Sequence, residues 1–255
     1  MMNADSRLGP VLLYDLAGAD DERRISPFCW RIRMALAHKR LAVQTQPWRM
    51  VEKDRIAEAK VQTVPVIVDA GRSIGDSWVI AEYLDSQYPA NPLFESAQAR
   101  AYCFWIHHWT ERVLHQSIVP IILEDVLSLL HEKDVIYFRR TREHSYKKPL
   151  EMVFDRSPQA FDRLARELMP LRRVLAQSQF IGGEFPGYGD YIVFGALQWA
   201  RCCSPQPVLS RPDDPVVGWF ARMLGLYDGL GRTAKSFPTL ADATPATNSA
   251  QARRK

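Results

Sequence analysis

The chain has 255 residues, of which 47% are hydrophobic and 24% charged, and its formal net charge is +4. This composition is close to that of a globular protein, and the length provides for one or two domains with a sizeable core. The mild positive charge gives no reason to expect a nucleic-acid partner, because basic and acidic residues are interleaved along nearly the whole chain.

The cysteines and the apolar segments indicate the cellular compartment in which the protein is expected. The sequence contains four cysteines, at positions 29, 103, 202 and 203, whose spacing fits neither a disulfide framework nor a zinc site. Free thiols are typical of a reducing compartment, so we expect a cytoplasmic protein. The N-terminal stretch has an acidic residue early and an apolar run too short for a signal peptide. The longest apolar region, 118–130, is interrupted by Pro120, Glu124 and Asp125, so no membrane span is expected.

The first ninety residues alternate between strand and helix patterns. Strands are predicted over 11–16, 41–48 and 64–70, with a short returning strand in "GRSIG", and helices over 27–39 and 76–88. A strand–helix–strand unit followed by a hairpin and a helix indicates a small α/β layer, which we assign to a domain over 1–90.

After the proline-rich stretch "PANPLF" the pattern becomes helical. Helices are predicted over 99–119, 135–146, 161–175, 190–203 and 214–229, with a kink at Pro170 in the third. The segment 190–203 is apolar nearly all round and is expected to be a central buried helix. We therefore predict an all-helical domain over 91–235 and a disordered tail over 236–255.

Ser26-Pro27 begins the first predicted helix. Serine is a good N-cap and proline is favoured at the first helical position, so a structural role alone would account for the pair. A helix N-terminus also stabilises an anion, and a serine hydroxyl at that position can donate a hydrogen bond to a thiolate. Both interpretations use the same geometry.

Two further pairs carry the same ambiguity. Val64-Pro65 is either an ordinary strand start or a cis-proline turn that would leave the backbone of Val64 free to pair with an extended peptide. Asp76-Ser77 is either a helix cap or a site that holds a ligand's ammonium and carboxylate together. The order of these pairs within one α/β domain favours a binding site for a peptide-like thiol.

At these residues the sequence resembles the glutathione S-transferases, and within them the subgroup of bacterial lignin β-etherases and related fungal-type enzymes. The resemblance spans nearly the whole chain. Its residues are "LYDL" (13–16), "ISPFCWRIRMALAHK" (25–39), "VPVIVDAGRSIGDSWVIAEYLDSQYP" (64–89), "PLRRVLAQSQFIGGEFPGYGDY" (170–191) and "DDPVVGWFARMLGLYDGLG" (213–231).

The resemblance implies an α/β N-terminal thioredoxin-like domain plus an all-α C-terminal domain, assembled as a homodimer that uses glutathione as co-substrate. Ser26 matches the residue facing the glutathione sulfur, and Val64, before a cis Pro65, matches the residue pairing with the cysteinyl backbone. Asp76 and Ser77 match the residues holding the γ-glutamyl end. Arg49 and Lys53 are both candidates for the glycine carboxylate, and the sequence does not choose between them. Gly187 replaces the usual Ser or Thr cap of the buried helix.

The implied chemistry is attack of the glutathione thiolate on a small hydrophobic, aromatic electrophile, which in the β-etherase subgroup is an α-keto β-aryl ether. We expect the acceptor pocket to lie between the domains, with Phe28, Trp105, His108 and Trp109 as candidate lining residues. A core position is the structural alternative for these aromatic side chains.

Two alternatives remain at this point. Cys29 could be the nucleophile of a glutathione-dependent redox enzyme, although it occupies the resolving rather than the attacking position of the motif. The protein could also bind glutathione or another ligand without turnover. A metal site at His107-His108 is not expected, because adjacent helix positions face different ways. The basic segment "RRTREHSYKK" is interpreted as a solvated helix face.

Overall fold

A four-stranded sheet forms the first layer of the molecule. The computed structural model describes residues 9–244, so expectations about residues 1–8 and 245–255 lie outside the described residues. The strands are ordered β2-β1-β3-β4, with bounds β1 (Val11–Leu16), β2 (Val43–Trp48), β3 (Val66–Asp69) and β4 (Arg72–Gly75). Strand β2 is parallel to β1, whereas β3 and β4 are antiparallel to their neighbours. The parallel pair requires a crossover connection.

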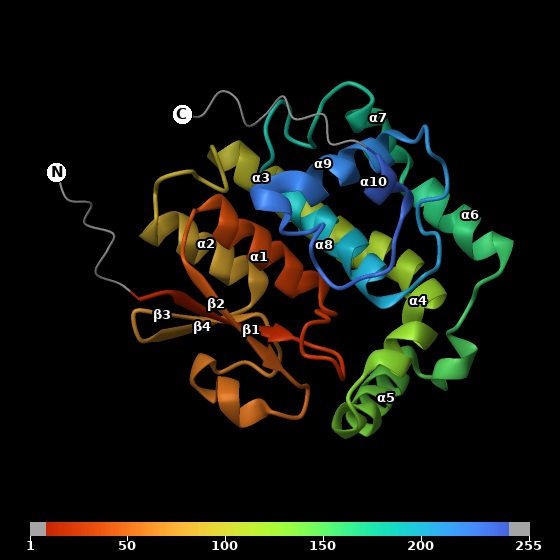
Figure 1. Ribbon diagram of the computed structural model, residues 1–255, viewed down its shortest axis with the longest axis horizontal. Helices are drawn as coiled ribbons and strands as arrows, with labels where there is room; N and C mark the ends of the chain where they lie inside the picture. Colours follow the sequence, from red (N-terminus) through yellow and green to blue (C-terminus); the bar gives the residue numbers. More distant parts are fainter. Residues whose placement is uncertain (1–8, 245–255) are drawn as a thin grey trace.

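Helix α1 (Pro27–His38) is that crossover, and α2 (Ser77–Gln87) follows β4. Both helices lie between the sheet and the remaining helices (Figure 1). Eight of the residues of α1 are buried, because the helix lies between the sheet and α8 and packs along α8 (Figure 1). The start of α1 is therefore held at the boundary between the α/β layer and the helical part.

The rest of the described chain is helical. Its helices are α3 (Ala97–Trp109), α4 (His115–Leu129), α5 (Glu132–Tyr146), α6 (Pro158–Glu167), α7 (Met169–Leu175), α8 (Tyr188–Cys203), α9 (Pro215–Gly229) and α10 (Leu240–Ala243). Every residue of α8 is buried, which confirms the predicted central helix. Within residues 9–244, none of the helices combines the length and apolar character needed to traverse a lipid bilayer.

Several predicted boundaries need correction. Helices α3 and α4 are joined through a π-helical turn, Thr110–Leu114, and continue ten residues beyond the predicted end at Val119. The predicted break near Pro170 is confirmed, since α6 ends at Glu167 and α7 begins at Met169. Predicted disorder from Ser236 is wrong over 236–244, because the Asp242 carboxylate of α10 pairs with Arg201 of α8 at 2.7 Å.

Candidate active site

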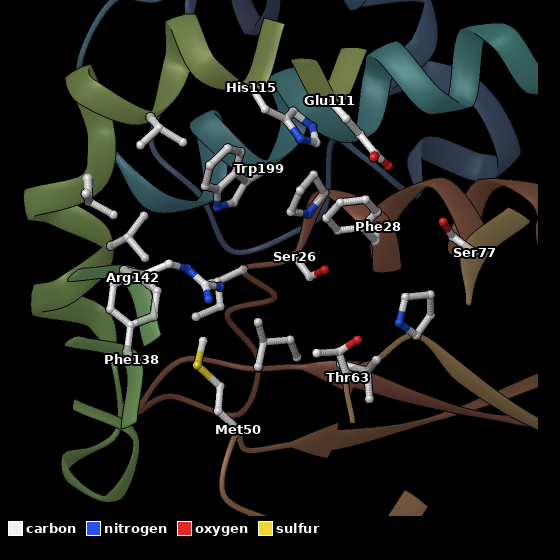
Figure 2. A pocket seen from close by; sticks show the side chains of 18 of the residues that line it. Ser26, Phe28, Met50, Thr63, Ser77, Glu111, His115, Phe138, Arg142 and Trp199 are labelled. Atoms are coloured by element: carbon white, nitrogen blue, oxygen red, sulfur yellow. The ribbon is translucent and has the colours of Figure 1, made fainter. Parts of the chain in front are cut away.

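A cavity of about 590 Å³ lies where the α/β layer meets the helical part, and both contribute its walls (Figure 2). The α/β layer supplies the starts of α1, β3 and α2, and the segment after β2. The helical part supplies residues of α3, the π-helical turn, α4, α5 and α8. Of the predicted site residues, the cavity brings together Ser26, Phe28, Lys53, Val64, Pro65, Asp76 and Ser77.

Ser26 is the N-cap of α1. Its backbone is extended, with φ −119° and ψ 124°, and its Oγ accepts a hydrogen bond from the backbone N–H of Cys29 at 3.2 Å. The predicted cap is thereby confirmed, with Pro27 in the first turn. Ser26 is also a lining residue of the cavity, so the positive end of the α1 dipole faces the cavity interior. A hydroxyl that accepts the capping bond keeps its own proton available for a ligand.

Cys29 lies behind Ser26 and is fully buried. Burial raises the pKa of its thiol well above the ordinary value, and the Asp15 carboxylate adds to the rise, while a hydrogen bond with Ser26 works in the opposite direction. The thiolate is the reactive form of cysteine, so a buried thiol with a raised pKa is a poor nucleophile. The geometry therefore does not favour the redox alternative.

The Val64-Pro65 peptide bond is cis, in agreement with the expectation from the sequence resemblance. Both residues line the cavity, immediately before β3 begins. Within residues 9–244, neither the N–H nor the C=O of Val64 takes part in a backbone hydrogen bond. These two groups are therefore able to pair with the backbone of an extended ligand lying along the cavity.

Asp76 caps α2. Its Oδ1 accepts from the backbone N–H groups of Trp78 at 2.8 Å and Val79 at 3.0 Å. The residue has φ +70°, a conformation that costs free energy for a non-glycine residue and that concentrates at functional sites. Ser77 is buried beside it, and its backbone oxygen accepts from the Tyr188 hydroxyl at 2.7 Å. A carboxylate and a helix N-terminus thus stand together at this end of the cavity.

The two candidates for the glycine carboxylate lie in different surroundings. Lys53 lines the cavity, with its Nζ 4.9 Å from the centre of the Trp48 ring and 4.8 Å from that of Tyr137. Arg49 does not line the cavity; its guanidinium is buried, pairs with Asp21 and donates to the Ala19 carbonyl at 3.4 Å. An arginine committed to a carboxylate is not available to a ligand, so the structure corrects the candidate Arg49.

Three of the four predicted acceptor-pocket residues lie outside the cavity. Trp105 is 64% exposed and stacks on Trp109 with ring centroids 6.4 Å apart, and His108 is exposed. The physical reason is helical phase. The cavity-facing residue of α3 is His107, and the two tryptophans are two positions away from it, about 200° around the helix. Phe28 alone of the four lines the cavity.

The sequence did not reveal the cavity-lining residues in and beside the π-helical turn. His107, Glu111 and His115 are four residues apart and all line the cavity. A π-helical turn carries more residues per turn than an α-helix, so this spacing keeps successive side chains on one side. The nearest sequence signal is the repeat of polar residues every four positions, which an α-helical pattern would also produce.

His107, His108 and Glu111 place their ligand atoms within 4.8 Å of one another, contrary to the expectation that adjacent histidines diverge. A buried arginine occupies this cluster. Arg31 donates to His107 Nδ1 at 2.8 Å and lies 3.7 Å from Glu111, whose carboxylate is 3.2 Å from His107 Nε2. With Nδ1 accepting, the neutral ring carries its proton on Nε2, so neither nitrogen of His107 presents a free lone pair to a metal.

His115 is buried between two aromatic rings, 5.5 Å from Phe28 and 5.7 Å from Trp199 between centroids. Burial, with the nearby Arg31 and His107, lowers its pKa to about 3. Its Nε2 has no hydrogen-bond partner among the described residues. The His115 ring is therefore neutral at physiological pH, and its Nε2 is covered by neighbouring side chains.

The two sides of the cavity are tied together by Asp134 of α5. This fully buried carboxylate accepts from the backbone N–H groups of Met50 at 3.0 Å and Val51 at 3.1 Å. Met50 lines the cavity from the segment after β2, the same segment that carries Lys53. One acidic side chain thus couples the position of α5 to that of the α/β layer.

Comparison with known proteins identifies this arrangement. Residues 22–92 match the N-terminal domain of the glutathione S-transferases, and residues 101–219 match their C-terminal domain. Together the two matches cover well over half of the chain. The chain belongs to the glutathione S-transferase family. The predicted fold, a thioredoxin-like domain followed by a helical domain, is thereby confirmed.

The similarity to individual family members is low. Glutathione S-transferase U2 of Arabidopsis thaliana is 29% identical over 38% of this chain, and the glutathione S-transferase-like protein ustS of Aspergillus flavus is 27% identical over 49% of it. The chain spans about half the length of these relatives, 46% and 50% respectively. A glutathione S-transferase of Ceriporiopsis subvermispora, solved in complex with glutathione, shares the fold with a TM-score of 0.72 and 23% identity, over 86% of this chain and 97% of that one.

Proposed function

We propose that this protein is a glutathione S-transferase that activates the glutathione thiol for attack on a small hydrophobic, aromatic electrophile. One observation carries the proposal: Ser26, the free backbone of Val64 and the Asp76-Ser77 cap all face the same cavity. Each feature alone has a structural explanation, but together they offer a hydroxyl, a strand edge and a helix end to one γ-glutamyl-cysteinyl peptide.

In this proposal glutathione lies along the α/β layer. Its cysteinyl backbone pairs with Val64 and its γ-glutamyl ammonium meets Asp76, while the α-carboxylate takes the N-terminus of α2 at Ser77. Glu111 adds a second carboxylate at the γ-glutamyl end, and Lys53 binds the glycine carboxylate. The 3.7 Å pair between Glu111 and the fully buried Arg31 supports a fixed Glu111 side chain.

The proposed role of Ser26 is to stabilise the thiolate. A free thiol with a pKa of about 8.5 is only a few per cent ionised at neutral pH. The α1 N-terminus and a donated hydroxyl hydrogen bond favour the anion and lower that pKa. The thiolate sulfur then forms a bond to the electrophilic carbon, the leaving group departs with the bonding electrons, and the thiol proton passes to solvent.

Ether cleavage is the finer form of the proposal. Attack at the β carbon of an α-keto β-aryl ether would expel a phenolate and leave a glutathione thioether. The aromatic and apolar lining around Phe28 and Trp199 supports it, because an aryl ether needs such a surface to bind. The test is glutathione-dependent release of a phenol from an aryl-ether ketone, compared with conjugation of 1-chloro-2,4-dinitrobenzene. Conjugation without phenol release would retain the transferase and reject ether cleavage.

Two alternatives are separable from the proposal. If the protein were a redox enzyme, Cys29→Ser would abolish glutathione-dependent activity, whereas the proposal requires turnover to stay near that of the wild type. If it were a binding protein, it would be retained on immobilised glutathione yet would turn over neither electrophile. The burial of Cys29 supports retained turnover in Cys29→Ser, because a buried thiol does not reach the substrate.

We also propose a homodimer, located in the cytoplasm. The exposed apolar side chains Phe104, Trp105 and Val79 lie on α3 and α2, and large exposed aromatics favour a protein–protein contact. The four cysteines are buried and free, which suits a reducing compartment. Trp105→Glu should shift the protein from dimer to monomer in analytical ultracentrifugation. A dimer of unchanged affinity in this variant would place the interface elsewhere.

A further inference from the structure

Arg142 differs from the other arginines of the basic helix α5. Arg139 pairs outward with Glu143 at 3.0 Å and Glu151 at 2.8 Å. Arg142 instead lines the cavity, and Figure 2 shows its side chain extending from α5 toward the cavity interior, on the same side as Phe138 and Met50. The sequence alone suggested a solvated face for this whole segment, so this residue departs from that interpretation.

Arg142 has no acidic partner. Its Nη1 donates to Thr141 Oγ1 at 3.4 Å, and its guanidinium carbon lies 5.0 Å from the centre of the Phe138 ring. Within residues 9–244, no aspartate or glutamate oxygen lies within 4.0 Å of its guanidinium nitrogens. Burial lowers the pKa of Arg142 from its ordinary value, but a guanidinium remains charged in a protein. Arg142 is partly buried, and a partly desolvated cation without a counter-ion binds an anionic ligand more strongly than a fully exposed one would.

The surroundings of Arg142 describe the rest of such a ligand. The walls of this part of the cavity are largely apolar. Tyr137 and Tyr146 of α5 also line it, with Met50, Val119, Leu123, Val126, Phe138 and Trp199. The acidic residues that line the cavity, Asp76 and Glu111, belong to the start of α2 and the π-helical turn. In Figure 2 Glu111 and Ser77 lie across the cavity from Arg142 and Phe138. This half of the cavity thus combines the Arg142 guanidinium with a largely apolar enclosure, and the Lys53 ammonium, 4.8 Å from the centre of the Tyr137 ring, is a second cation that lines the cavity.

We propose that the acceptor substrate is an aromatic carboxylic acid whose carboxylate is bound by Arg142 while its ring fills the apolar half of the cavity. The inference rests on the proposed transferase function and narrows its substrate class. Arginine suits this task because its planar fork binds a carboxylate through two parallel hydrogen bonds. The ground-state contact is remote from the reacting carbon, so its loss should appear mainly in the KM of the acceptor.

One rival assignment uses the same residue. Arg142 could bind the glycine carboxylate of glutathione instead of the acceptor. Both assignments predict a lower kcat/KM when Arg142 is replaced, but they differ in the substrate whose KM rises. A glutathione contact would raise the KM for glutathione equally with every acceptor, whereas an acceptor contact would separate anionic from neutral acceptors.

The experiment uses two electrophiles with the same ring and leaving group, 4-chloro-3,5-dinitrobenzoate and its methyl ester, and each kcat/KM is divided by the uncatalysed rate because the ester is intrinsically the more reactive. In both, the glutathione sulfur forms a bond to the ring carbon and chloride departs. The wild type should prefer the acid. Arg142→Met should lower kcat/KM for the acid roughly 10- to 100-fold, with the ester little changed, because one charge-assisted contact is lost. Arg142→Lys should retain part of the preference, since it keeps the charge but not the fork.

Arg140→Met is the matched control. Arg140 is exposed on the same helix and does not line the cavity. The variant removes the same charge as Arg142→Met, so its ratio of kcat/KM for the acid to kcat/KM for the ester should equal that of the wild type. Equal losses for acid and ester in Arg142→Met, or a raised KM for glutathione with both, would overturn the inference. Thermal unfolding of each variant identifies a loss that comes from misfolding.

Failure of the proposed function is recognised separately. If the wild type turns over neither electrophile, the transferase proposal fails, and binding of the two preformed glutathione conjugates by calorimetry then tests Arg142 alone. A weaker affinity of Arg142→Met for the acid conjugate only would support the anion site. Equal affinities of both proteins for both conjugates would reject it.

Discussion

A Cβ atom added to Gly195 of α8 would lie 2.3 Å from the carbonyl oxygen of Pro27. Real Cβ atoms do not approach backbone atoms so closely, so the two helices touch here backbone to backbone. Pro27 follows Ser26, and Ser26 faces the cavity. The helical part therefore fixes the first turn of α1, and with it the position of the proposed thiolate donor, through the absence of one side chain.

Gly195→Ala should accordingly damage both stability and activity. The methyl group must displace the first turn of α1 or push α8 away, which should cost about 1–3 kcal/mol of unfolding free energy. Urea denaturation and glutathione conjugation measure the two effects. Gly218→Ala in α9 is the control, because its Cβ would meet only Arg222 Nη1, at 3.7 Å. Equal behaviour of the two variants would contradict the tight contact at Gly195.

Ser26→Ala should lower kcat more than it weakens glutathione binding. The variant loses the cap, worth about 0.5–2 kcal/mol, and the donor to the thiolate. Loss of one pKa unit of thiol activation would lower the thiolate fraction at neutral pH about tenfold. The pH profile of kcat should therefore move to higher pH.

Ser96→Ala separates these effects. Ser96 caps α3 in the same way, its Oγ accepting from Ala99 N–H at 3.0 Å, but it does not line the cavity. The variant should lose similar stability and keep its pH profile. An unchanged pH profile in Ser26→Ala would leave the backbone amides of α1 as the stabilising groups.

Lys53→Met should raise the KM for glutathione by roughly tenfold, the loss expected for one hydrogen bond to a charged group, with little change in kcat. Methionine retains much of the stem that packs on Trp48 and Tyr137. Arg49→Met should instead leave the KM for glutathione near that of the wild type, because Arg49 pairs with Asp21 and does not line the cavity. A KM effect in Arg49→Met larger than that in Lys53→Met would reverse the assignment.

Acid should destabilise the protein through His115. The folded-state pKa of about 3 lies below the ordinary 6.5, so the unfolded chain binds the proton first as pH falls. Stability is present above pH 6.5 and is lost toward pH 3, with about 2 kcal/mol lost between pH 7 and pH 5. His115→Phe should remove this part of the pH dependence in urea denaturation. His144→Gln, on the exposed side of α5, should leave it in place.

The sequence predicted most of the fold because its signals were local. A short apolar run predicts strand β1, and a Ser-Pro cap predicts the helix start at Pro27. The apolar character of α8 predicts a buried helix. The segment from 97 to 129 was predicted less well. Its π-helical turn depends on how α3 and α4 pack against neighbouring elements, and no residue pattern distinguishes it from an α-helix.

The candidate site divides in the same way. Ser26, Val64 and Asp76 sit at element ends, where caps and turns mark the position in the sequence. Trp105 and Trp109 were assigned to the wrong side because the phase of α3 relative to the cavity is a tertiary property. The choice between Lys53 and Arg49 depended on Asp21, a partner 28 residues away in the chain that no local pattern links to Arg49.

The hydrogen bonds between Asp134 and the backbone of Met50 and Val51 affect how a bulky product can leave the cavity. Separating α5 from the segment after β2 would break two hydrogen bonds to a buried carboxylate and leave that charge uncompensated. Release of the product by separating α5 from the segment after β2 would therefore cost free energy. Arg112 and Gln116, by contrast, are exposed lining residues, and within residues 9–244 their side chains make no hydrogen bond or ion pair. We expect the product to leave past Arg112 and Gln116. The rate of product release should therefore change when Arg112 or Gln116 is substituted and not when Asp134 is.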